Sequence, residues 1–162
     1  MTARHTLACN ALQALHRTVS GVRYAPDVAQ YLTVLDTPNC PYVMTWVGQS
    51  SLHSKGGGWL REDATLRVFC FVEPVGQGDI PSRTAEALEV MSALSALYVT
   101  IGNVRLLTPG DPAAEGYQMT IETGPGAQQV TCAGLRADLA FGGRAFVGFE
   151  LQVPILMAWG GA

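Results

Sequence analysis

The sequence has few charged residues. Asp, Glu, Lys and Arg make up 14% of its 162 residues, whereas an ordinary soluble domain carries about 25%. The hydrophobic class makes up 48%, and a further 18 residues are glycine. A single globular domain normally exposes only a few hundred Å² of continuous apolar surface. The composition therefore indicates either a membrane protein or a subunit whose faces are covered by other subunits.

A long apolar run is also missing, although a transmembrane helix needs about 18 or more consecutive apolar residues. Two glutamates interrupt the best candidate, residues 85–101, and Glu150 and Pro154 interrupt the other, residues 145–158. The first residues lack the continuous apolar stretch of a secretory signal. We therefore expect no membrane segment and synthesis in the cytoplasm.

Metal-ligand spacings and basic clusters are absent as well. Cys9, Cys40, Cys70 and Cys132 lie about thirty or more residues apart, and the three histidines complete no zinc-binding spacing. Cys70 lies in an apolar strand pattern, where a small buried hydrophobic residue is the common role. We expect structural thiols, no metal and no cofactor. A net charge of −3 with scattered basic residues argues against a general nucleic-acid-binding protein.

The sequence shows no catalytic constellation. Cys132 or Cys70 paired with His16 or His53 is the available nucleophile and base, but neither cysteine has the local signature of a nucleophile. Residues 54–58, Ser-Lys-Gly-Gly-Gly, place the lysine before the glycines, whereas a phosphate-binding loop has the opposite order. We expect no enzymatic activity.

Apolar periodicity predicts two main helices and several strands. The first helix is expected over 6–19, with Gln13 and His16 on its polar face. The second is expected over 82–101, with the apolar stripe Ala87, Val90, Leu94, Leu97 and Ile101. The expected strands are 42–47, 66–73, 104–107, 117–122 and 146–157. Pro154 cannot donate to a strand ladder, which favours an edge strand or a bulge. We expect an α+β fold, with a mixed or antiparallel sheet packed against two helices.

Residues 49–63, between the first two strands, contain three consecutive glycines. We expect them to form a long mobile hairpin loop that becomes ordered on a partner. Trp59 and Leu60 are the expected apolar anchors, and Lys55 and Arg61 the expected polar contacts. The alternative is a solvated hairpin tip that binds nothing.

The order of these elements resembles the tail terminator proteins of long-tailed bacteriophages, a family also called tail completion or minor tail proteins, of which the lambda tail terminator is the familiar example. The likeness is carried by the strand 66–74 running into EPVGQGDIPSRTAEAL, and by GGRAFVGFELQVPI before the closing strand. ETGPG is a looser likeness to the acidic turn that precedes that strand. Together these parts cover about two thirds of the chain.

The resemblance implies a single tail-terminator-like domain over residues 1–162 that assembles as a ring, usually a hexamer, in the virion. The ring would cap the head-proximal end of the tail tube, stop its polymerisation and offer a surface to the head–tail connector. DNA would pass through the lumen without specific binding. The alternatives are another neck or head-closure ring protein, or, in a different class, a small-molecule-binding α+β domain or enzyme.

Overall fold

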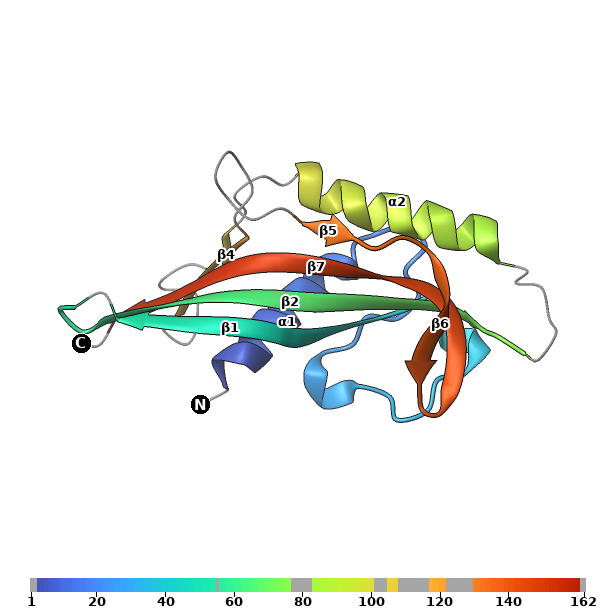
Figure 1. Cartoon of the computed structure of the whole chain (residues 1–162), viewed down its shortest axis with the longest axis horizontal. Helices are drawn as coiled ribbons and strands as arrows, with labels where there is room; N and C mark the ends of the chain where they lie inside the picture. The colour runs from blue at the N-terminus through green and yellow to red at the C-terminus, as the bar shows by residue number, and fades with distance from the viewer. Residues whose placement is uncertain are drawn as a thin grey trace.

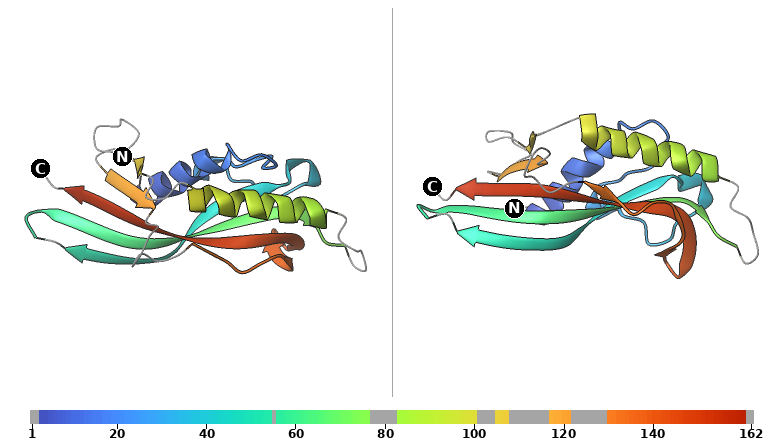
Figure 2. Two further views of the ribbon diagram at one scale, coloured as in Figure 1. Left: turned by 90° about the horizontal axis from the view of Figure 1, so that it is seen from above. Right: turned by 45° about the horizontal axis from the view of Figure 1, so that its top comes forward.

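The computed structural model describes residues 3–54, 56–76, 83–100, 105–107, 117–121 and 130–160. In these residues a single sheet is covered on one face by two α-helices (Figure 1 and Figure 2). The pairings between its named strands are all antiparallel. The expected α+β fold is therefore confirmed, with an antiparallel sheet.

The first described element is helix α1, and the last is the longest described strand, β7. The helices are α1 (Arg4–His16) and α2 (Thr84–Thr100), with 3₁₀ turns η1 (Val28–Gln30) and η2 (Thr37–Asn39) after α1. The strands are β1 (Tyr42–Ser54), β2 (Trp59–Pro74), β3 (Arg105–Leu107), β4 (Tyr117–Ile121), β5 (Thr131–Cys132), β6 (Arg136–Phe141) and β7 (Arg144–Gly160). The order across the sheet is β1-β2-β7-β4-β3, and β5 and β6 also pair with β7. The last strand is therefore central, and two strands, β5 and β6, were not predicted.

The connection between β1 and β2 differs most from expectation. The predicted mobile loop over 49–63 is wrong, because the two strands stay paired from Gln49 opposite Thr65 to Ser54 opposite Leu60. Gly56, Gly57 and Gly58 have φ angles of 76°, 60° and 80°, which a glycine adopts without strain. On its other side the same stretch of β2 pairs with β7, from Thr65 opposite Pro154 to Trp59 opposite Gly160. Pairing on both sides gives β2 an order that its local sequence does not predict.

The main core lies between the sheet and the two helices. Alternate residues of the central strands point toward the helices: Leu66, Val68 and Cys70 of β2 and Phe149, Leu151 and Val153 of β7 are all buried. Ala8 and Leu12 of α1 and Ala87, Val90 and Leu94 of α2 pack against them. The predicted stripe of α2 is corrected at its end, because Tyr98 is buried and Leu97 is only half-buried. Ile101 lies outside the described residues.

A buried polar network joins α1, α2 and β1. The Gln13 side-chain amide donates to the carbonyls of Pro26 and Val43, both at 2.8 Å, and its oxygen accepts from Thr45 Oγ1. That oxygen also lies 3.0 Å from His16 Nδ1, so Nδ1 carries the proton, while Nε2 accepts from the Tyr98 hydroxyl. The prediction that Gln13 and His16 face away from the core is therefore wrong. Each is buried because its polar atoms have partners.

A second, aromatic cluster lies on the opposite face, at the end where β6 and β7 form a hairpin. It contains Leu35, Cys40, Tyr42, Met44, Phe71, Leu139 and Phe146. The predicted covering of β2 on both faces is therefore confirmed at this end, where Cys70, Phe71 and Val72 are all buried. Between this cluster and the turn at 56–58, no described element covers the same face of the sheet (Figure 2).

Pro154 lies in a central strand, so its predicted place on an edge or at a bulge is wrong. On one side it is opposite Thr65 of β2, with no shift of register there. On the other side β4 ends its pairing at Ile155 and β5 begins at Gln152. Pro154 therefore falls between two partner strands, where its missing N–H interrupts no ladder of the described residues.

Candidate assembly surface

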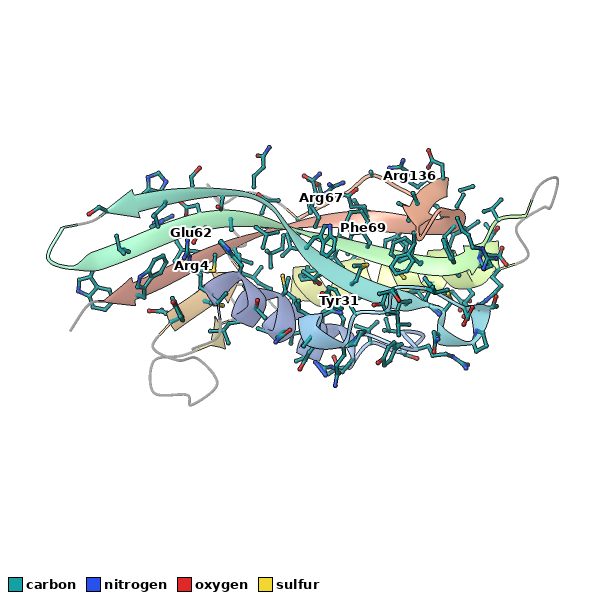
Figure 3. The ribbon with its side chains drawn as sticks, turned by 90° about the horizontal axis from the view of Figure 1, so that it is seen from below. Arg4, Tyr31, Glu62, Arg67, Phe69 and Arg136 are labelled. Carbon is teal, nitrogen blue, oxygen red and sulfur yellow. The ribbon has the colours of Figure 1, made fainter. Side chains whose placement is uncertain are left out.

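The β1–β2 hairpin extends the sheet beyond the helices, and the end of β7 runs beside it (Figure 1). We call the face of the sheet opposite the helices the open face. Arg67 and Arg136 lie on this open face, whereas Arg4 and Glu62 lie between β2 and α1 (Figure 3). Away from the aromatic cluster, the open face and the tip of the hairpin are not covered by any described element, and neither is the outer edge of β1 beyond Thr45.

The tip brings together three of the four predicted partner-binding residues. Trp59, Leu60 and Arg61 line a shallow cavity of about 320 Å³, together with Gly56 of the turn and Leu156 and Ala158 of β7. The Trp59 side chain is 57% exposed and its ring lies over Gly160, where an added Cβ would come within 3.0 Å of it. Lys55 lies outside the described residues. The cavity is largely apolar, so it suits an apolar side chain of a partner.

Toward the middle of the sheet the open face is polar. A cavity of about 300 Å³ is lined by Gly48, Gln49, Thr65, Arg67 and Gln152. The Arg67 guanidinium binds both carboxylate oxygens of Glu150, at 2.6 and 3.0 Å, and lies over the ring of Phe69. Nearer the tip Arg61 binds Asp63 at 2.8 Å. These arginines are held in ion pairs, so this part of the face is not a strip of unpaired positive charge.

An ion-pair cluster fixes α1 to the hairpin. Glu62 is buried, and its carboxylate accepts hydrogen bonds from Arg4 and His5 of α1. Burial alone would raise the pKa of Glu62, but hydrogen bonds from Arg4, His5 and Ser50 outweigh burial and lower this pKa below its usual value. Arg4 also lies over the Trp159 ring, 5.1 Å from its centroid. These contacts therefore hold the part of the hairpin nearest α1 in a fixed position against that helix.

The outer edge of β1 is closed at its start. Val43 donates its N–H to the Tyr24 carbonyl at 2.9 Å. At Thr45 one Tyr31 hydroxyl accepts from the backbone N–H, at 2.9 Å, and donates to the backbone carbonyl, at 2.8 Å. Both edge groups of Thr45 are therefore satisfied inside the subunit. No local sequence pattern indicates this use of Tyr31, because the contact joins the segment after η1 to a distant strand.

Beyond Thr45 no described element covers the edge. Trp46 is 50% exposed and Leu52 is 57% exposed. No residue from Trp46 to Ser54 is Asp, Glu, Lys or Arg, and β1 stands last in the order of the described strands, paired with β2. Natural edge strands are usually protected by charge, proline, a bulge or a cover. β1 has one bulge, between Val47 and Gln49, and beyond it the described edge has none of these protections. This part of the edge is therefore a surface suited to a partner.

The candidate bases have other partners than the candidate nucleophiles, because His16 bonds Gln13 and Tyr98 and His53 pairs with Asp63. Cys70 is fully buried, which raises the pKa of its thiol, and Cys132 is exposed on the short strand β5. Burial, with a smaller effect of Arg17, lowers the pKa of His16 to about 3. Across the described ranges, no three His, Cys, Asp or Glu side chains are grouped to hold a metal ion.

The helices within the described residues include none that is long and apolar enough to cross a membrane. No protein-family model matches this chain, and no curated protein sequence matches it.

Proposed function

We propose that this chain is a structural subunit of a bacteriophage tail, a tail terminator that caps the head-proximal end of the tube as a ring. Its partners are further copies of itself, the tail tube protein and the head–tail connector. In this role it acts by surface contact alone and stops the tube by covering its last ring. The order of elements, which resembles that of tail terminators, supports this assignment to a phage tail.

The single structural observation that carries the proposal is the projecting hairpin. Its outer strand has no charged residue from Trp46 to Ser54, and its exposed large side chains are Trp46, Leu52 and Trp59. Such a surface is unfavourable on an isolated subunit and favourable at an interface. The chain carries 14% charged residues in all, which fits a ring subunit with lateral and axial faces covered. A net charge of −3 suits a lumen through which DNA slides without sticking.

The test is to image the protein with and without tail tubes. We expect negative-stain micrographs of purified tubes mixed with this protein to show a ring at one tube end only, and further tube subunits to stop adding there. Tubes that keep growing at their usual rate in its presence would overturn the proposal. A ring found on the portal in place of the tube would assign the chain to another part of the neck.

A further inference from the structure

We propose that the open edge of β1 pairs with the same edge of a second copy, in antiparallel orientation, so that two sheets join across a two-fold axis. This inference concerns the free subunit and goes beyond the proposed capping function. Contacts around a cyclic ring are heterologous, whereas a two-fold contact uses the same surface on both copies. The pairing described here is therefore a second mode of association, separate from the ring.

The backbone of β1 has the groups that such pairing needs. The Tyr31 hydroxyl forms hydrogen bonds with the N–H and C=O of Thr45, so these two groups point away from β2. The N–H and C=O groups of successive β2 residues point alternately toward β1 and toward β7. Those of Val68, opposite Thr45, point toward β7, and so do those of Ala64 and Glu62. Ser50 and Leu52 lie opposite Ala64 and Glu62, so their own N–H and C=O groups point away from β2, as those of Thr45 do. Their outward N–H and C=O groups are available to another strand.

The length of the edge is sufficient for a specific contact. A bulge separates Val47 from Gln49, and past it the strand from Gln49 to Ser54 spans about 20 Å at 3.4 Å per residue. The Tyr31 hydroxyl stops any added strand before Thr45, because the groups of Thr45 are already used. The free part of the edge therefore has one defined end, which limits the possible registers.

The charges on the edge strands of this sheet favour a second copy of the chain as the partner of β1. β6, on the far side of the sheet, carries Arg136 and Asp138, and β3 has only three residues. Within the described residues, β1 is the one long boundary strand without charge. Two β1 edges bring no like charges together, and they cover Leu52 of both copies, which is half-exposed in the single subunit.

The test compares two variants of Leu52 with a control on the far edge. Leu52→Pro removes one outward N–H, which an edge strand tolerates, and Leu52→Lys adds charge to the same edge. Ala137→Lys adds the same charge to exposed β6. Sedimentation of the wild-type protein should give twice its 17.2 kDa mass. Because each substitution acts twice in a two-fold dimer, Leu52→Pro should raise the dissociation constant roughly 10- to 100-fold, and Ala137→Lys should leave it unchanged.

Amide hydrogen exchange gives a second measurement that does not depend on a variant. Exchange at Ser50 and Leu52 should slow as the wild-type concentration rises, and exchange along β6 should not. A wild-type protein that stays monomeric at every concentration would overturn the proposal. So would a dimer that Leu52→Pro leaves intact, or protection of these amides only when tube protein is added. Capping of tubes is scored separately, so loss of the dimer and loss of the function are distinguishable.

Discussion

One side-chain hydroxyl closes the edge of β1 at a buried position. Tyr31→Phe keeps the ring against Trp46 but leaves the N–H and C=O of Thr45 without this partner. Thr45 is fully buried, so we expect the free energy of unfolding to fall by about 1–3 kcal/mol in urea denaturation. Tyr24→Phe is the matched control, because Tyr24 contacts β1 through its main chain and its ring, and the substitution keeps both. Equal stability of Tyr31→Phe and the wild type would show that water replaces the hydroxyl.

Glu62 makes the free energy of unfolding depend on pH. Its pKa is lowered in the folded protein, so its carboxylate contributes stability above the unfolded value of about 4.3 and loses that contribution as pH falls through the folded value. Glu62→Gln should therefore be less stable than the wild type at neutral pH, and the difference should shrink in acid. Urea midpoints at several pH values measure this. A difference that stays constant with pH would exclude the ionised carboxylate as its cause.

The clearest error of the sequence-based predictions concerns Gln13 and His16 of α1. Gln13 and His16 have polar side chains, so their spacing places them on an exposed helix face. In the structure they are buried because partners on β1, α2 and the segment before η1 satisfy them. No pattern within one helix contains that information, because the partners come from distant parts of the chain.

At the scale of elements, α2 offers the clearest packing prediction. Leu94 is fully buried in the main core, and Leu94→Ala should lower the free energy of unfolding by about 2–5 kcal/mol. Leu97→Ala on the same helix is the control. Because Leu97 is only half-buried, its truncation should cost clearly less. Chemical denaturation of both variants measures the two losses of unfolding free energy. Equal losses would contradict the finding that Leu94, and not Leu97, faces the core.

The elements that sequence predicted best are those with strong apolar periodicity. The core face of β7, from Phe149 to Met157, and most of α2 were predicted, because buried faces repeat at the period of the element. The distal hairpin was not predicted, since residues 49–54 are mostly polar and small. Its order comes from pairing of β2 with β7, across about ninety residues of chain.

Trp59 remains the strongest partner-binding prediction, now on a strand in place of a loop. Trp59→Ala should change the free energy of unfolding by less than about 1 kcal/mol, because the ring is 57% exposed. It should nevertheless weaken attachment to tubes, measured by cosedimentation. Leu88→Ala, an exposed residue on α2, serves as the control for loss of apolar surface elsewhere. Full attachment by Trp59→Ala would remove the tip from the interface.

For the molecule as a whole, scarcity of charge predicts how association responds to salt. Interfaces held by ion pairs weaken as salt screens them, whereas backbone pairing and apolar contacts do not. We expect the self-association constant to change little between roughly 0.05 and 0.5 M salt. Sedimentation at several concentrations measures this constant. A steep fall with salt would show that charged side chains dominate the contact between copies.

The central position of β7 sets the order of events during synthesis. β2, β4, β5 and β6 all pair with β7, yet β7 is the last of them to leave the ribosome. Until residues 144–160 emerge, one side of β2 has no neighbour, and its apolar face is exposed to other nascent chains. The sheet therefore assembles after translation has passed its final strand, and a chaperone that shields β2 during that interval should raise the yield of folded protein.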